Sequence, residues 1–266
     1  MYEQVKKIAG KIIERTATIA RLNREEEQGR IRGGRIAVEA TLVAGGADRA
    51  SREGQRVTGK GIGEGAEVAQ EEALRQYADA EGLLFSAEDI QDMSDFVLPF
   101  GAEAKVYKSR RHEKRVIKVV NYKIFSESAL EYLDNRITLH NYIFPFTAYT
   151  LEGFADTENG LSFVVSQNFI QGVNLEALAV SETDISIYKL LEQYDRIAKY
   201  LKRTLKFSPI GRDSFQNSNY IIEDLHLNNV KLGVDGNLYF IDTVISLNTP
   251  EDEFDGVRQY IEFDII

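Results

Sequence analysis

An Asp-Gly pair at positions 235 and 236 constrains the fold of this chain most strongly, because it lies between two short runs of alternating apolar residues. Asp-Gly favours a two-residue turn and therefore predicts a β-hairpin. In that register Asn229 and Asp242 face each other at the open end of the hairpin. Side chains that oppose each other directly have Cβ atoms about 5 Å apart. Two oxygen-bearing groups at this distance suit one hard cation such as Mg²⁺.

Two more charged residues fit the same site. Asp224 precedes Asn229 by five residues, which is close enough for its carboxylate to reach the same locality. Lys118 lies on the apolar face of an expected strand over 116–120, where a lysine rarely occurs without a partner. Two simpler alternatives stay open from these residues alone. In one, the polar residues only end a surface hairpin and cap a turn; in the other, Lys118 is an edge-strand lysine whose ammonium group reaches solvent.

Apolar periodicity predicts a fold of mixed helices and strands. Alternating or β-rich segments indicate strands, and apolar residues three or four positions apart indicate helices. Expected strands cover 106–107, 115–120, 148–154 and 161–166, with a helix over 127–142 and a long helix over 185–205. This order gives an antiparallel sheet that carries one helix, followed by the long helix and short strands.

The N-terminal part of the sequence has a different character. The first 28 residues have the spacing of an amphipathic helix that needs a partner surface, and 66–81 predicts a second helix that ends at Gly82. Between them, residues 29–65 are rich in Gly and Arg without sustained periodicity, so we interpret them as a linker or mobile arm.

Charge is distributed unevenly along the chain. Basic residues outnumber acidic ones over 1–63, whereas the whole chain carries a net charge of −10. Such a basic arm binds nucleic acid or its own acidic body. We favour the second, because no aromatic residues interleave with the arginines to stack on bases.

Composition excludes several classes of protein. The chain has no cysteine, which rules out disulfides, thiolate metal sites and cysteine nucleophiles and points to a reducing, cytoplasmic setting. No apolar run approaches the roughly 20 residues that cross a bilayer, and the first residues lack the pattern of a signal peptide. We therefore expect a soluble cytoplasmic protein that does not bind membranes.

Four segments together resemble the protein-kinase-like folds. They are Gly-Ala-Glu-Ala-Lys-Val-Tyr at 101–107, Val-Ile-Lys at 116–118, the loop 224–229 and Ile-Asp at 241–242. More narrowly, the chain resembles the kinase-like domain of polyvalent proteins carried by bacterial mobile elements and phages. This similarity rests on Leu-His-Asn-Tyr at 139–142, Phe-Ile-Gln-Gly at 169–172, Glu-Asp-Leu-His at 223–226 and Leu-Asn-Thr-Pro at 247–250.

The resemblance implies an α+β, protein-kinase-like fold with two lobes. The kinase-like domain would span 96–266, with an N-lobe over about 96–168 and a C-lobe over about 169–266. Few residues follow Asp242, so the C-lobe is expected to be reduced. Residues 1–95 would form a preceding helical and Gly/Arg-rich segment, and its first helix is a candidate surface for a protein partner.

The resemblance also implies the chemical roles of individual residues, with ATP and Mg²⁺ as cofactors. Asp224 would take the proton of the acceptor hydroxyl, Lys118 would hold the α- and β-phosphates, and Asn229 and Asp242 would hold Mg²⁺. The other nucleotide-binding residues would be Gly101, Val106, Gln167, Phe169 and, as the ion-pair partner of Lys118, Glu131. His226 would support Asp224, whereas His112 and His140 are expected to carry no chemistry.

The partner of Lys118 has alternatives. Glu127, one helical turn before Glu131, is the other candidate for the ion pair. In another alternative, either glutamate only caps or solvates its helix, because Ser128 and Glu131 have the spacing of a capping box.

These assignments lead to one main functional hypothesis. The chain would be an ATP- and magnesium-dependent phosphotransferase that transfers the γ-phosphoryl group to a hydroxyl of a protein or small molecule. The alternative is a catalytically weak pseudokinase that acts as a nucleotide-binding or interaction module. A nucleic-acid-binding role for the N-terminal arginines is the least favoured.

Overall fold

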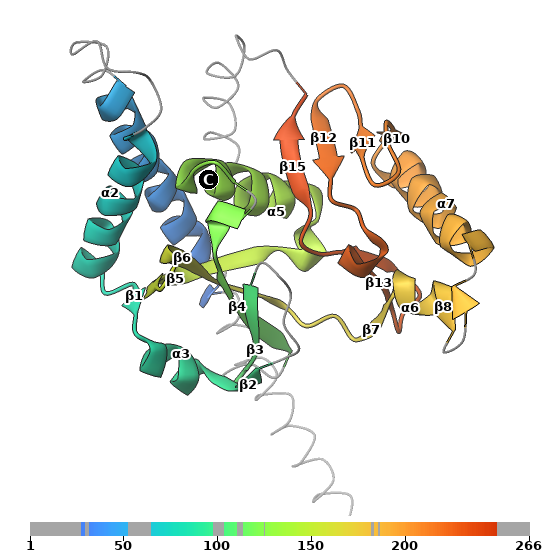
Figure 1. The fold of residues 1–266 in the computed structure, drawn as a ribbon, viewed down its shortest axis with the longest axis horizontal. Coiled ribbons are helices and arrows are strands. Elements are labelled where there is room, and N and C mark those ends of the chain that lie inside the picture. Colours follow the sequence, from blue (N-terminus) through green and yellow to red (C-terminus); the bar gives the residue numbers. More distant parts are fainter. Residues whose placement is uncertain are drawn as a thin grey trace, which may run out of the picture.

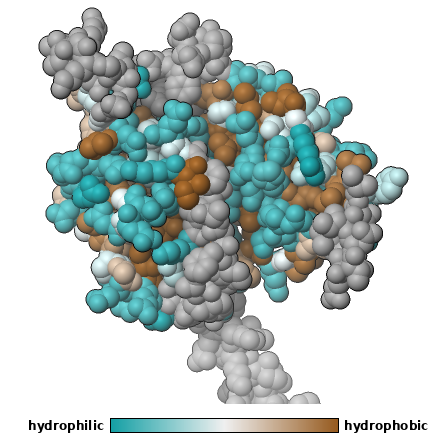
Figure 2. All heavy atoms as spheres, in the orientation of Figure 1, coloured by the Kyte–Doolittle hydropathy of each residue, from teal (hydrophilic) through white to brown (hydrophobic). Residues whose placement is uncertain are grey.

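The computed structural model describes residues 28–29, 32–52, 65–97, 104–110, 114–124, 126–181, 184–185 and 187–248. Helices and strands are mixed, as expected, with a larger sheet on one side and smaller sheets around α7 on the other (Figure 1). On the face shown in Figure 2, the described surface is mainly hydrophilic and its apolar side chains form separate patches. Gly101 and nearly all of the helix expected over the first 28 residues lie outside the described residues.

Six strands form the main sheet, in the order β1-β5-β6-β4-β3-β2. They are β1 (Leu84–Phe85), β2 (Ser94–Val97), β3 (Ala104–Ser109), β4 (Arg115–Val120), β5 (Tyr149–Thr157) and β6 (Gly160–Asn168). β1 runs parallel to β5, and the other neighbouring pairs are antiparallel. Every residue of β4 is buried, because this strand lies inside the sheet. The four expected strands in this region are confirmed.

A helix with a π-helical middle packs on this sheet. It consists of α4 (Ala129–Glu131), η2 (Tyr132–Thr138) and α5 (Leu139–Ile143), between the 3₁₀ turns η1 (Tyr122–Ile124) and η3 (Pro145–Thr147). Tyr132 stacks on Phe163 of β6 with ring centroids 4.6 Å apart. The helix expected over 127–142 is confirmed, and the π-helical stretch is a local widening that the apolar pattern did not reveal.

Residues 32–52 form a helix, so the linker expected over 29–65 is wrong for this part. Its buried apolar residues are Ile36, Ala37, Ala40 and Ala44, which share one hydrophobic core with the main sheet. Gly33 touches β5, since a Cβ added there would lie 2.1 Å from Cγ2 of Thr150. The glycine and alanine residues that suggested a linker are the ones that allow the helix to pack closely on the sheet.

α2 (Ala66–Ala80) lies beside the helix 32–52 (Figure 1). Tyr77 donates a hydrogen bond to Glu39 at 2.7 Å, which joins the two helices. Gly82 is left-handed and ends α2 as expected, with φ of 64°. β1 and then α3 (Ala87–Met93) follow directly, and β1 pairs in the main sheet. The domain boundary expected between 95 and 96 therefore divides one packed unit.

The C-terminal part has a hydrophobic core of its own. The long helix expected over 185–205 is confirmed as α7 (Ile187–Thr204), and Ile197 and Leu201 bury its apolar face. Around it lie β7 (Gly172–Asn174), α6 (Leu175–Ala179), β8 (Val180–Ser181), β9 (Asp184–Ile185), β10 (Ser208–Pro209), β11 (Phe215–Gln216), β12 (Tyr220–Glu223), η4 (Leu227–Asn229), β13 (Val230–Gly233), β14 (Leu238–Phe240) and β15 (Val244–Leu247).

The Asp-Gly hairpin is present as β13 and β14, but its expected register is wrong. The pairing leaves three residues in the loop, and Gly236 has φ of 80°, the left-handed conformation that closes a three-residue loop. The residue opposite Asn229 is Ile241, whose amide donates to the Asn229 carbonyl at 2.8 Å. Asp242 therefore lies one residue beyond the position that a two-residue turn predicts.

Burial of the helix 32–52 generates a test. Ala40→Asp would place an unpaired carboxylate in the apolar core, and we expect the melting temperature to fall by about 10 °C or more. Val38→Asp is the matched control, because Val38 is 45% exposed on the same helix, and it should change the melting temperature by only about 2 °C or less. Thermal melts that show equal effects of the two changes would contradict the packed helix.

Candidate active site

An ion pair between Lys118 of β4 and Asp242 forms the centre of the candidate site. Nζ of Lys118 lies 2.5 Å from Oδ1 of Asp242, and Lys118 is only 5% exposed. Tyr149 of β5 donates its hydroxyl to the same carboxylate oxygen at 2.6 Å. The Lys118 ammonium lies 5.3 Å from the centre of the Tyr149 ring. The alternative of an edge-strand lysine that reaches solvent is therefore wrong, because β4 is an interior strand.

The surroundings of Asp242 keep its carboxyl group ionised. Burial opposes ionisation, but the charge of Lys118 and the hydrogen bonds from Lys118 and Tyr149 outweigh it, so the pKa of Asp242 lies below its usual range. Arg136 of η2 adds positive charge, and its Nη1 donates to the Asp242 carbonyl at 3.0 Å. Asp242 thus receives hydrogen bonds from side chains of β4, β5 and the π-helical stretch η2.

Asn229 and Asp224 lie beside Asp242. Nδ2 of Asn229 donates to the Asp224 carbonyl at 2.9 Å and to its Oδ2 at 3.2 Å, and it lies 3.5 Å from the Asp242 carbonyl oxygen. Both aspartates have left-handed backbones, with φ of 61° and 55°. Such strained positions cluster at functional sites. The fold thus brings the three residues together, although through a different hairpin register.

Asp224 contrasts with Asp242 in its electrostatics. Burial raises the pKa of the Asp224 carboxyl, and the charges of Arg136 and His226 oppose this rise only in part. A raised pKa makes the carboxylate a better acceptor for a proton. The two neighbouring carboxyl groups are therefore suited to different tasks.

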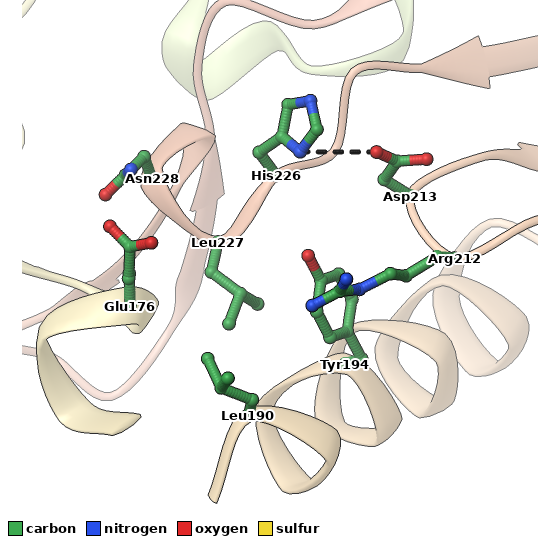
Figure 3. Close-up of a pocket in the computed structure, with 8 residues that line it drawn as sticks. All are labelled: Glu176, Leu190, Tyr194, Arg212, Asp213, His226, Leu227 and Asn228. Atoms are coloured by element: carbon green, nitrogen blue, oxygen red, sulfur yellow. Dashed lines mark ion pairs between the residues drawn. The ribbon is translucent and has the colours of Figure 1, made fainter. Parts of the chain in front are cut away.

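His226 lies between two carboxylates. Its Nε2 is 3.0 Å from Oδ1 of Asp224. Its Nδ1 is 3.2 Å from Oδ2 of Asp213, the contact that Figure 3 draws. Each ring nitrogen faces a carboxylate oxygen, so the two contacts hold the ring between Asp224 and Asp213. His226 contacts Asp224 as expected, and Asp213 is a second partner that the sequence did not indicate.

The expected ion pair between Lys118 and Glu131 does not form. Oε2 of Glu131 accepts a hydrogen bond from the Glu127 amide at 2.6 Å, and the Glu131 amide donates to the Ser128 hydroxyl at 3.1 Å. In the described part of the chain, neither glutamate pairs with Lys118. The capping alternative is thus the correct one, because Asp242 already neutralises the lysine.

Two expected nucleotide-binding residues lie near Lys118 on neighbouring strands. Val106 of β3 pairs directly with Lys118 and is half-buried. Gln167 of β6 is buried, and its side-chain amide donates to the Thr147 carbonyl at 2.5 Å. Gln167 therefore fixes the end of β6 to η3.

The backbone amides that follow β6 differ in whether they have a partner. The Phe169 amide is engaged, because it donates to the Lys114 carbonyl at 2.6 Å. The Ile170 amide has no partner among the residues that the structure describes. Of the segment expected beside the adenine, Ile170 and not Phe169 can therefore donate a backbone hydrogen bond.

Sequence reasoning missed Arg136, Tyr149 and Asp213. Arg136 carried a usable signal, because it lies three residues after Leu133 on the apolar face of the helix, where an unpartnered charge is as unusual as at Lys118. Tyr149 and Asp213 carried none. Tyr149 meets its partner across 93 residues, a contact that only the folded chain creates.

The oxygen atoms of Asn229 and Asp242 fit a magnesium site. Oδ1 of Asn229 and Oδ2 of Asp242 have no hydrogen-bond partner within the described ranges. Those ranges contain no group of three or more His, Cys, Asp or Glu residues suited to a metal ion. Mg²⁺ commonly takes one or two protein carboxylates and completes its shell with water and phosphate oxygens. The donors present suit Mg²⁺ that is held together with a phosphate.

His140 of α5 supports the site from behind. Its Nδ1 lies 2.8 Å from the Thr243 hydroxyl, next to Asp242, and its Nε2 lies 3.1 Å from the Thr147 carbonyl. Burial lowers the pKa of His140 to about 4, so the ring is neutral at pH 7. Nε2 then donates to Thr147, and Nδ1 accepts the hydrogen bond from Thr243.

The comparison with protein families matches the chain to one class of protein, the kinases. The model of the serine/threonine/tyrosine kinase found in polyvalent proteins matches residues 67–249. The match covers more than half of the chain, so the chain belongs to this family, and the resemblance seen in its sequence is confirmed. Among curated proteins no significant match occurs. No helix of the described part is both long and apolar enough to cross a membrane.

Buried His140 should make stability sensitive to acid. Its pKa of about 4 lies below the value of about 6.5 in an unfolded chain, so the unfolded chain binds the proton first as the pH falls. This contribution is present above pH 6.5 and is lost as the pH falls towards 4, by about 2 kcal/mol between pH 7 and pH 5. Urea unfolding at both pH values should show a smaller loss for His140→Asn, and an equal loss in the two proteins would refute this role.

Proposed function

We propose that this member of the kinase family transfers the γ-phosphoryl group of ATP to an acceptor hydroxyl in the presence of Mg²⁺. The observation that carries the proposal is the hydrogen-bonded cluster of Lys118, Asp242, Asn229 and Asp224. This cluster supplies a cation, two free oxygens for a metal and a carboxylate for a proton. In the proposed two-lobed fold, the main sheet is the N-lobe and the part around α7 is a reduced C-lobe.

The nucleotide would lie between the main sheet and the hairpin β13–β14. The Lys118 ammonium has three N–H donors and uses one on Asp242, which leaves donors for phosphate oxygens. Gly101, which lies outside the described residues, would bind the phosphates, with Val106 beside them. The adenine would lie beside the segment that contains Gln167 and Phe169, and the free Ile170 amide of this segment would bind it.

The protein groups would perform the transfer by positioning and proton acceptance. Mg²⁺ held by Asn229 and Asp242 would neutralise phosphate charge. The acceptor oxygen forms a bond to the γ-phosphorus, the bond from that phosphorus to the bridging oxygen breaks, and ADP leaves with the electron pair. Asp224 accepts the hydroxyl proton, and its raised pKa suits this task.

A catalytically weak nucleotide-binding module is the second candidate. The observation that favours it is the pairing of Lys118 with Asp242 and not with Glu131, since the lysine is then committed to the metal-binding residue. In this case ATP and Mg²⁺ raise the melting temperature, because they bind the native state, but no ADP forms. A cytoplasmic location fits either function, because the chain contains no cysteine.

The buried ion pair provides a first test of the site. Asp242→Asn leaves the buried Lys118 ammonium without its partner, which costs about 3–5 kcal/mol of stability, whereas Lys118→Met leaves a partly exposed carboxylate and costs less. The double variant removes both charges and should recover most of the melting temperature, whereas all three variants should lose ADP formation from γ-labelled ATP. Turnover that survives in the stable double variant would rule out the proposed site.

Asp224→Asn separates catalysis from folding. Asparagine tolerates the left-handed backbone at this position and removes a half-buried charge, so the melting temperature should stay the same or rise. Phosphoryl transfer should fall by about 10²–10⁴-fold, the usual effect of a lost general base, while ATP binding persists. Wild-type activity should decline in acid at a pH above the ordinary aspartate pKa of about 3.9, because the base must be ionised. An unchanged rate in Asp224→Asn would show that Asp224 is not the base.

A further inference from the structure

A pocket of about 300 Å³ lies beside the candidate active site, and none of the residues assigned to ATP or Mg²⁺ lines it (Figure 3). Its residues come from α6, α7, η4 and the two loops that carry Arg212 and His226. Pockets for drug-sized ligands range from about 300 to 1,000 Å³, so this one suits a small compound. Leu190 and Leu227 give it an apolar floor.

His226 connects this pocket to the proposed base. It lines the pocket and also contacts Asp224, with Nε2 3.0 Å from the carboxylate. A compound in the pocket therefore lies one side chain away from the group that would accept a hydroxyl proton. Asp213, the other partner of His226, lines the same pocket and is occupied by that contact.

Two groups of opposite charge, Glu176 and Arg212, lie on different sides of the pocket. Figure 3 shows Glu176 with Asn228 on one side and Arg212 with Tyr194 on the other. The Arg212 guanidinium lies over the Tyr194 ring at 4.9 Å from its centre, which holds the group in place. In the described part of the chain, no carboxylate pairs with Arg212 and no cation pairs with Glu176. Each side therefore retains an unused charge.

We propose that this pocket binds the acceptor and that the acceptor is a small hydroxy amino acid in its zwitterionic form. The ammonium group binds Glu176 and the carboxylate binds the planar fork of Arg212. The hydroxyl extends out of the pocket past His226, so that it reaches Asp224. This inference rests on the proposed kinase function. In the transfer, the amino acid oxygen bonds to the γ-phosphorus of ATP, ADP leaves with the electrons of the broken bond, and Asp224 takes the proton. The products are an O-phosphoamino acid and ADP.

Calorimetry with the full chain and either L-serine or L-homoserine tests the pocket, both alone and with Mg²⁺ and a non-hydrolysable ATP analogue. We expect at least one amino acid to bind, and Glu176→Gln and Arg212→Gln each to weaken that binding by about tenfold or more. The matched controls are Glu192→Gln and Lys202→Gln, which alter exposed charges of α7 outside the pocket and should leave affinity unchanged. Ethanolamine and 3-hydroxypropionate each lack one of the two charges and should bind at least about tenfold more weakly.

The outcomes distinguish this inference from the proposed function. Binding of the ATP analogue without binding of either amino acid overturns the acceptor assignment and leaves the kinase proposal standing. Equal effects of pocket and control variants, or phosphorylation of a blocked serine peptide in preference to the free amino acids, also overturn it. Amino acid binding with no binding of the ATP analogue retains the pocket as an amino acid site and refutes the kinase proposal.

Discussion

Burial of Lys118 inside the main sheet is the constraint on which the rest of the site depends. The ammonium group is almost fully removed from solvent on an interior strand, so it needs a carboxylate partner. Asp242 arrives from the end of the hairpin in the other hydrophobic core, and Tyr149 and Arg136 complete its hydrogen bonds. The ion pair between Lys118 and Asp242 thus connects the two hydrophobic cores. Its geometry is more specific than that of an apolar contact.

The same arrangement gives two neighbouring aspartates opposite properties. Lys118 lowers the pKa of Asp242 and keeps it a carboxylate suited to a metal, whereas burial raises the pKa of Asp224 and makes it suited to accept a proton. Environments that move two carboxyl groups apart in this way are how enzymes assign different roles to one residue type. Both aspartates also have left-handed backbones, which the surrounding hydrogen bonds to Asn229 and Tyr149 hold in place.

A series of side-chain contacts runs from Lys118 through Asp224 to the proposed acceptor pocket. Lys118, Asp242, Asn229 and Asp224 are linked in that order, and His226 continues the series to Asp213 and the pocket. Donor and acceptor would therefore approach Asp224 from opposite ends of one polar network. Such a network orients its members together, so that proton acceptance and phosphate positioning depend on the same contacts.

The sequence by itself determined the four strands between 106 and 166, the two long helices at 127–142 and 185–205 and the kinase family, because turn signals, periodicity and short motifs are local. It also singled out Lys118, Asp224, Asn229 and Asp242 as the candidate site. Tertiary structure decided what these residues touch. The three-residue loop set the hairpin register. Because β4 lies inside the sheet, Lys118 pairs with Asp242 and not with Glu131. Residues 32–52, which the sequence suggested were a linker, form a helix that packs closely on β5. These contacts join residues far apart in the chain, where burial and not local pattern selects the partner.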